Sequence, residues 1–169
     1  EILYEYANFT QMHEKEKNEI NGNILLNILG KQKEKAVFEI DASQIPDLIP
    51  VICVAAANTD AITRIVNAAR LRLKESDRIK TSCELIKSIG GTVAEKKDSI
   101  VIRGSKIPLK GGTVNSHGDH RIAMAAAIAA LKTLNGITIK DHKCVDKSYP
   151  KFFEDLKSVG GQINELNMG

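Results

Sequence analysis

The sequence contains one twelve-residue pattern twice, first as Glu84-Leu-Ile-Lys-Ser-Ile-Gly-Gly-Thr-Val-Ala-Glu95 and again as Glu154-Asp-Leu-Lys-Ser-Val-Gly-Gly-Gln-Ile-Asn-Glu165. In both copies the spacing of apolar residues predicts the end of an amphipathic helix. The Gly-Gly pair predicts a left-handed helix terminus, and the alternation that follows it predicts a short strand. We therefore expect two copies of one structural unit, roughly 70 residues apart.

The residues before each copy also match. Each copy follows a β-branched stretch typical of a strand and, before that, an apolar stretch that predicts a buried helix. The strands are expected at 61–67 and 136–140, and the helices at 49–57 and 122–131. A further strand is expected at Ser99–Arg103, and Thr113–Asn115 leads into the second apolar helix. The order is that of a β-α-β-α-β-β unit.

The two apolar helices predict the fold class, because a helix that is apolar on every face must be enclosed by other elements. Repeated units packed around buried central helices, with sheets outside, predict one pseudo-symmetric α+β domain. We expect a partial unit at residues 1–42, a second unit at 43–112 and a third at 113–169. The partial unit should hold a helix at 1–8 and strands at 24–29 and 36–40, while the polar stretch 9–19 is also compatible with a loop.

Composition narrows the functional class. Apolar residues make up 43% and charged residues 27%, as in ordinary water-soluble domains, and a net charge of +3 is too small to require a nucleic-acid partner. Cys53, Cys83 and Cys144 show no disulfide or zinc spacing and suit a reducing cytoplasm. The apolar stretches are shorter than the ~20 residues of a membrane span. The chain opens at Glu1 without a secretory leader and is expected to begin inside a larger gene product.

Charged residues gather where the predicted helices begin, in Asp41–Asp47, Lys74–Arg78, His117–Arg121 and Lys147–Pro150. Free backbone N–H groups make such positions suitable for anions. An arginine such as Arg78 can hold a carboxylate or phosphate by two parallel hydrogen bonds, and Lys74, four residues earlier, is expected on the same side of a helix. These motifs predict a small, anionic, phosphorylated ligand.

The same residues also have an ordinary structural explanation. Lys74–Arg78 is compatible with a helix cap whose charges are solvated, and His120 with a hydrogen-bonded structural histidine. Their combination with Asp41, Glu75 and Asp119 favours acid-base chemistry, because carboxylates placed among cations acquire divergent pKa values. The His and Cys residues show no metal-ligand spacing, and no glycine-rich phosphate loop is present, so no metal site is expected.

Four motifs together resemble the C-terminal half of the 5-enolpyruvylshikimate-3-phosphate synthase family. They are Leu71–Ile79, His117–Ala125, Asp41–Asp47 and Lys147–Pro150, and the resemblance runs from about residue 34 to 161. It implies two domains of three β-α-β-α-β-β units each, which close over the substrates. Residues 1–169 would then be the single C-terminal, phosphoenolpyruvate-contacting domain, without the N-terminal domain.

The reaction implied by the resemblance transfers the carboxyvinyl (enolpyruvyl) group of phosphoenolpyruvate to the 5-hydroxyl of shikimate 3-phosphate and releases phosphate. It proceeds by addition and elimination, without metal or organic cofactor. The resemblance further implies a cytoplasmic, monomeric enzyme of the shikimate pathway of aromatic amino acid biosynthesis, in the family that glyphosate targets. The family's N-terminal substrate-binding cluster has no counterpart here, so we expect the isolated chain to be inactive.

The proton-handling roles are carried over motif by motif. Asp41 resembles the base that takes the 5-hydroxyl proton and also contacts substrate. Glu75 resembles the group that handles the proton at the phosphoenolpyruvate methylene. Lys74 is expected to bridge the two substrates and to share the acid role.

The anion-holding roles follow in the same way. Arg78, Arg121 and Lys147 are expected to hold the phosphate and carboxylate of phosphoenolpyruvate, whose charge must be neutralised before a hydroxyl can attack. Asp119 and His120 are expected to orient Arg121. Some family members have an asparagine at the position of Arg70, so the contact made there stays open.

Two other functions remain in view. The UDP-N-acetylglucosamine enolpyruvyl transferase family shares this fold and chemistry, although its cysteine acid lies in the other half and the Lys74–Arg78 and His117–Arg121 motifs point away from it. A non-catalytic basic module for RNA or an acidic protein is the second alternative. Aromatic residues make up only 4% of the chain, so stacking platforms for bases are scarce.

Overall fold

The computed structural model describes residues 10–11 and 35–165. The first complete repeat runs through β2 (Ala36–Asp41), α3 (Ile49–Ala57), β3 (Ala61–Val66), the 3-10 helix η2 (Ala69–Leu73), α4 (Arg78–Ser88), β4 (Thr92–Glu95) and β5 (Ile100–Arg103). Apart from the added 3-10 helix, this order confirms the β-α-β-α-β-β unit that the sequence predicts.

The second repeat follows the same order as far as its second helix. It consists of β6 (Gly112–Asn115), α5 (His120–Ala130), β7 (Ile137–Lys140), the 3-10 helix η3 (His142–Lys147) and α6 (Phe152–Ser158). The strand expected after the second Gly-Gly pair is not formed at residues 162–165. In the first repeat β4 pairs only with β5, and no described strand stands in the place of β5 in the second repeat, so this stretch has no ladder to join.

Two sheets result. One has the order β1-β2-β3-β5-β4, in which β2 and β3 are parallel and the other pairs are antiparallel, and the other is the parallel pair β6-β7. β1 (Thr10–Gln11) falls in the stretch considered as a loop. The expected helix at 1–8 and strand at 24–29 lie outside the described residues, whereas β2 confirms the strand expected at 36–40. We expected this strand in the partial unit, but its parallel pairing with β3, like that of β6 with β7, makes it the first strand of a repeat.

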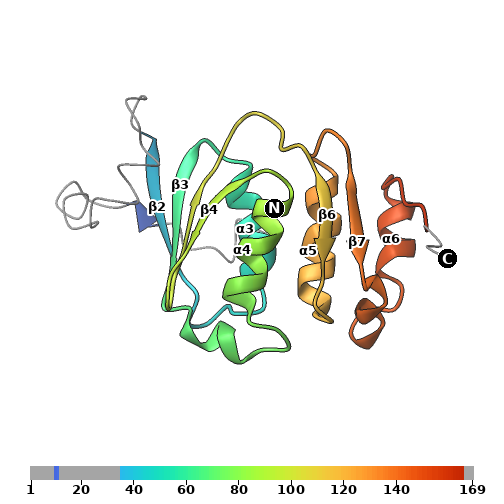
Figure 1. The fold of residues 1–169 in the computed structure, drawn as a ribbon, viewed down its shortest axis with the longest axis horizontal. Helices are drawn as coiled ribbons and strands as arrows, with labels where there is room; N and C mark the ends of the chain where they lie inside the picture. Colours follow the sequence, from blue (N-terminus) through green and yellow to red (C-terminus); the bar gives the residue numbers. More distant parts are fainter. Residues whose placement is uncertain (1–9, 12–34, 166–169) are drawn as a thin grey trace.

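Three helices, α3, α4 and α5, lie between the two sheets (Figure 1). α3 packs against both α4 and α5, and its Ile49 and Cys53 are fully buried. On α5, Ala126 is equally buried. This layering confirms an α+β fold with buried central helices. Among the residues that the structure describes, no helix is long and apolar enough to cross a membrane.

Both Gly-Gly pairs end a helix in the predicted way. Gly90 has a φ of +88°, its N–H donates to Lys87, and the N–H of Gly91 donates back to Ile86. Gly160, with a φ of +103°, repeats this double hydrogen bond at the end of α6. The left-handed backbone is available to glycine at little steric cost, which explains why both copies keep it.

The register of the two parallel strand pairs aligns their carboxyl ends. Asp41 at the end of β2 lies opposite Val66 of β3, and Asn115 at the end of β6 lies opposite Lys140 of β7. Immediately after β3 and β7, Asn67 and Asp141 have positive φ values of 55° and 57°. Each repeat therefore places an Asp/Asn pair at the same edge of its sheet. In β2 and β3 this pair forms part of the candidate site.

Candidate functional site

Asp41 is held in a fixed orientation at the carboxyl end of β2. Its Oδ1 accepts a hydrogen bond from the backbone N–H of Ser43 at 2.7 Å, and its Oδ2 accepts one from the side-chain amide of Asn67 at 3.0 Å. These hydrogen bonds, the Ser43 N–H first, hold the pKa of Asp41 below its usual value, because they favour the charged carboxylate. Asp41 is exposed, so its carboxylate is open to solvent.

Arg78 is the first residue of α4, and its side chain is 1% exposed. Its Nε donates to Oδ2 of Asp119 at 2.8 Å and its Nη2 to Oδ1 of Asp119 at 3.2 Å. Nη1 donates to Asp47 at 2.7 Å, and Nη2 also donates to Glu75. Arg78 thus donates two hydrogen bonds to a carboxylate of its own chain, that of Asp119. The charge of Arg78 is buried rather than solvated.

Asp119 connects this arginine to the next repeat. It is fully buried and caps α5, where its Oδ1 accepts from the backbone N–H of Arg121 at 2.9 Å. Its Oδ2 also accepts from the hydroxyl of Ser76 at 2.9 Å. We expected Asp119 to orient Arg121, and its carboxylate contacts the backbone N–H of that residue, while its side-chain partners are Arg78 and Ser76.

Charge pairing shifts the pKa values of this group. Burial alone would raise the pKa of Asp119, but the hydrogen bonds from Arg78 and Ser76 and the charge of Arg78 lower it overall. Burial alone would lower the pKa of Arg78, and its hydrogen bonds and charge interactions with carboxylates, Asp119 first, raise it instead. Both groups therefore remain ionised in the folded protein.

Asp47, in the loop before α3, is shared by three cations. Its Oδ1 lies 3.0 Å from Nζ of Lys74 and 2.7 Å from Nη1 of Arg78, and its Oδ2 lies 3.8 Å from Nη2 of Arg121. Lys74, Arg78 and Arg121 come from two repeats, so the tertiary fold brings together three of the four cations that the sequence singles out.

Lys74 reaches Asp47 by a route that differs from the expectation. It follows η2 and precedes Asp77, the N-cap of α4, so Lys74 and Arg78 do not share a helix face. The cap itself is a single hydrogen bond, because the side chain of Asp77 accepts from the N–H of Lys80 and no acidic residue stands there to reciprocate. Lys74 and Arg78 meet because both reach the same carboxylate.

The remaining candidates form no ion pair with Asp47 among the described residues. Lys147 is exposed at the end of η3 and, among the described residues, forms no ion pair with the group around Asp47. His120 is buried as the first residue of α5. Arg70 is exposed on η2. Glu75 is about half-exposed and contacts Arg78, which places it beside the cations.

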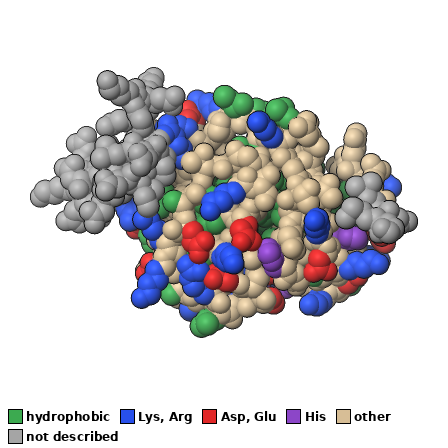
Figure 2. All heavy atoms as spheres, in the orientation of Figure 1, with side chains coloured by type: hydrophobic (Ala, Val, Ile, Leu, Met, Phe, Trp, Pro, Cys, Tyr) green, Lys and Arg blue, Asp and Glu red, His purple; other side chains and the backbone are tan. Residues whose placement is uncertain are grey.

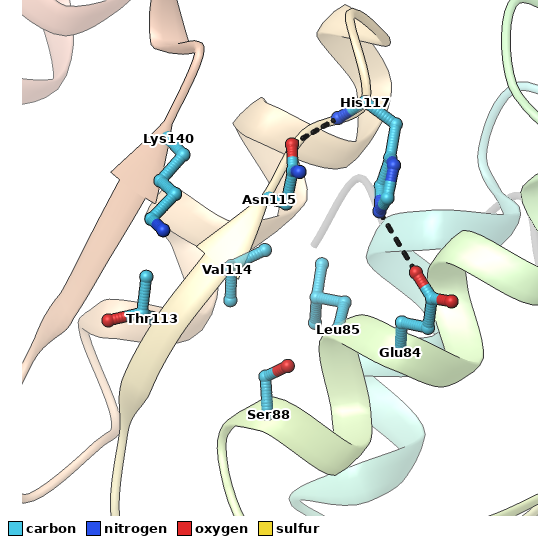
Figure 3. A pocket seen from close by; sticks show the side chains of 8 residues that line it. All are labelled: Glu84, Leu85, Ser88, Thr113, Val114, Asn115, His117 and Lys140. Carbon is cyan, nitrogen blue, oxygen red and sulfur yellow. Dashed lines mark hydrogen bonds and ion pairs between the residues drawn. The ribbon is translucent and has the colours of Figure 1, made fainter.

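A separate cavity of about 310 Å³ lies between α4 and β6. Glu84 and Ser88 line it from α4, and Lys140 lines it from β7 (Figure 3). His117 points toward Glu84, with its Nε2 2.9 Å from Oε2 (Figure 3). None of the candidate site residues lines this cavity.

One face of the molecule carries both signs of charge. On the face shown in Figure 2, Lys and Arg side chains alternate with Asp and Glu side chains over the lower half. The described residues contain no group of three or more His, Cys, Asp or Glu side chains that could hold a metal ion. A small anion is better suited to the cations at Asp47 than an extended polyanion, which needs a continuous basic surface.

Sequence reasoning missed three residues of this arrangement. Asp47 and Ser76 lie inside quoted motifs, but no role was assigned to them, and Asn67 was read only as part of a strand. The local excess of cations was a usable signal for Asp47, because buried or clustered cations need carboxylate partners. An Asn directly after a strand is also a common left-handed position.

Comparison with known proteins identifies the family of the chain. Residues 7–156 match the family model described as EPSP synthase (3-phosphoshikimate 1-carboxyvinyltransferase). The 3-phosphoshikimate 1-carboxyvinyltransferase of Clostridium acetobutylicum is 52% identical over 130 residues, which are 77% of this chain and 30% of that protein. The protein of the same name from Clostridium botulinum strain Eklund 17B is 45% identical over 161 residues, or 94% of this chain and 36% of that protein.

Solved structures give the same result. An EPSP synthase from Acinetobacter baumannii superposes with a TM-score of 0.67 and 37% identity, over 70% of this chain and 28% of that one. The enolpyruvyl transferase NikO from Streptomyces tendae shares the fold, with a TM-score of 0.61 and 22% identity over 79% of this chain and 30% of that one. The chain thus spans about a third of the length of these relatives. Because the family model covers most of its residues, this chain belongs to the EPSP synthase (3-phosphoshikimate 1-carboxyvinyltransferase) family.

Proposed function

We propose that this chain is the phosphoenolpyruvate-contacting part of an enzyme that transfers the carboxyvinyl group of phosphoenolpyruvate to the 5-hydroxyl of shikimate 3-phosphate. Membership of the family supports the reaction. The observation that carries the assignment to this site is the convergence of Lys74, Arg78 and Arg121 on Asp47. Phosphoenolpyruvate carries a phosphate and a carboxylate, and cations grouped at one place can hold such an anion.

The carboxylates beside these cations provide the proton transfers. Asp41 accepts the 5-hydroxyl proton while the hydroxyl oxygen bonds to C2 of phosphoenolpyruvate and C3 takes up a proton. Phosphate then leaves C2 and C3 loses a proton, which restores the carbon-carbon double bond. We assign the C3 proton to Glu75, with Lys74 sharing that role, because both lie beside Arg78 and Asp47.

The other candidates take binding roles in this proposal. Arg121 and Arg78 face the phosphoenolpyruvate anion, and Lys147 is assigned to its far side, where it would approach when the enzyme closes. Asp119 and His120 support the start of α5, from which Arg121 projects.

In this proposal, catalysis also needs the part of the enzyme that these residues do not match. The chain corresponds to 30% of the Clostridium acetobutylicum relative, and we propose that the shikimate 3-phosphate site is completed by the rest of a two-domain, monomeric enzyme. The three cysteines are buried free thiols, which suits our assignment of the enzyme to the reducing cytoplasm.

A chimera tests the function. Residues 35–165 would replace the matching segment of the Clostridium acetobutylicum enzyme, and phosphate release from phosphoenolpyruvate would be measured with shikimate 3-phosphate as acceptor. We expect turnover that depends on this acceptor and that Asp41→Asn lowers strongly through kcat. A folded chimera that releases phosphate only with UDP-N-acetylglucosamine, or with neither acceptor, would contradict the proposal.

A further inference from the structure

We propose that Asp47 is a built-in competitor for the ligand: its carboxylate pairs with the cations of the site, and the anionic group of the incoming ligand displaces it. This inference rests on the proposed function, because it takes the cations around Asp47 to be the anion site. It adds a residue that sets how tightly the site holds an anion.

The contacts of Asp47 distinguish it from the other carboxylates of the site. Asp47 is the one that contacts Lys74, Arg78 and Arg121 together. Its side chain is 49% exposed, so it can turn toward water without giving up a buried position. Asp119, by contrast, is 0% exposed and caps α5, so displacing it would uncover a buried charge.

Charge counting gives the reason for displacement. The side chains in contact are three cations, Lys74, Arg78 and Arg121, and three carboxylates, Asp47, Glu75 and Asp119. These charges sum to zero, so an anion that approaches the intact group meets no net attraction. When Asp47 turns away, the group has a net positive charge and its cations are open to the ligand.

Arg121 supplies an independent sign that a ligand atom belongs here. Its Nε is buried and has no hydrogen-bond partner among the described residues. Buried donors are almost always paired, because an unpaired one keeps the full cost of losing water. Its Nη2 lies 3.8 Å from Asp47, which is too long for a strong hydrogen bond. An anion that replaced Asp47 would offer oxygen acceptors to this guanidinium.

The test measures binding of inorganic phosphate to the full chain by calorimetry at constant ionic strength. Asp47→Asn removes the charge and keeps the shape, and we expect it to tighten phosphate binding by about tenfold. Asp47→Glu keeps the charge and should bind phosphate about as weakly as the native chain. Equal or weaker binding by a folded Asp47→Asn variant would overturn the proposal, since it would make Asp47 a mere support for the cations.

Asp60→Asn is the matched control. Asp60 is 43% exposed and is also shared by two lysines, Lys35 at 2.8 Å and Lys106 at 3.3 Å, outside the candidate site. The variant changes the net charge by the same amount, so we expect phosphate affinity to stay at the native level. Equal tightening in both variants would show a general charge effect and overturn the specific role of Asp47.

A second measurement needs no variant. In the native chain, the carboxyl carbon of Asp47 can be followed by NMR as the pH is changed, with and without saturating phosphate. Displacement should move the pKa of Asp47 upward, because the carboxylate loses its cations and faces an anion. An unchanged titration with phosphate bound would overturn the inference. Phosphate binding requires no turnover, so an inactive chimera would count against the reaction and not against this competition.

Discussion

Arg78 and Asp119 form a side-on pair, in which Nε lies 2.8 Å from Oδ2 and Nη2 lies 3.2 Å from Oδ1. Arg78 begins α4 and Asp119 caps α5, so one buried ion pair joins the starts of helices from two different repeats. The pair fixes the two helix starts beside which Lys74 and Arg121 both reach Asp47. Several measurable properties of the protein depend on it.

Arg78→Met should destabilise the chain by about 3–5 kcal/mol, because it leaves the carboxylate of Asp119 buried without a cation. Urea denaturation followed by circular dichroism measures this. Lys80→Ala is the control, since its side chain is 61% exposed and lies 4.0 Å from Glu84 across one helix turn. That change should cost less than about 0.5 kcal/mol.

The double variant Arg78→Met/Asp119→Leu distinguishes two causes of destabilisation, the loss of the ion pair and the burial of an unpaired carboxylate. We expect it to be more stable than Arg78→Met alone, because no unpaired charge is then buried. If the single variant unfolds at the same urea concentration as the native chain, Arg78 does not neutralise Asp119 in solution.

Acid should weaken the fold in part through Asp119. The pKa of Asp119 is lowered in the folded chain from the ordinary aspartate value of 3.8. Below that value the unfolded chain takes up a proton that the folded chain does not, so stability present at higher pH is lost as pH falls toward the folded pKa. Urea midpoints measured between about pH 6 and about pH 3 should fall steeply at the acid end. The Asp119→Asn variant should have a lower urea midpoint at about pH 6, and this midpoint should depend less on pH. If the midpoint of the variant falls as steeply as that of the native chain, the effect comes from other carboxylates.

Asn67→Asp should shift the acid side of the chimera's kcat profile to higher pH. The amide of Asn67 now donates to Asp41 at 3.0 Å, whereas a second carboxylate there would raise the pKa of the pair, because two neighbouring carboxylates repel each other. In the proposed mechanism Asp41 is the base, which requires its ionised form. Asn67→Gly is the control, because it keeps the positive φ without adding a charge, and we expect a smaller shift. Identical profiles for Asn67→Asp and the native chimera would remove Asp41 from the proton transfer.

Gly104→Ala should destabilise the chain by about 2–3 kcal/mol or prevent folding, because the backbone comes close at this point. A Cβ there would lie 2.2 Å from the carbonyl oxygens of Ala56 and Thr59, at the end of α3. Gly136→Ala is the comparison, since a Cβ would meet nothing within 4 Å but the φ is +70°. It should cost only about 1–2 kcal/mol, and thermal unfolding measures both. If both variants lose the same stability, the backbone around Gly104 moves aside to make room for the added Cβ.

Local patterns in the chain were enough to predict the repeat. The helix ends at Gly90 and Gly160 depend on a few neighbouring residues. The apolar composition of the stretches that form α3 and α5 is enough to predict that these helices are buried. Such features are set by short-range sterics and by the hydrophobicity of one segment. The strand expected at 162–165 failed for the opposite reason, because a strand needs a partner that its own sequence does not provide.

By itself, the sequence determined the order of elements, the class of fold and the residue types of the site. Only the tertiary structure decided that Asp47 lies among Lys74, Arg78 and Arg121, and that Arg78 pairs with Asp119. Side chains far apart along the chain meet only when strand register and helix packing set their loops side by side. The sequence of a charged motif therefore indicates which kinds of partner it needs, whereas the packed fold determines which residue becomes that partner.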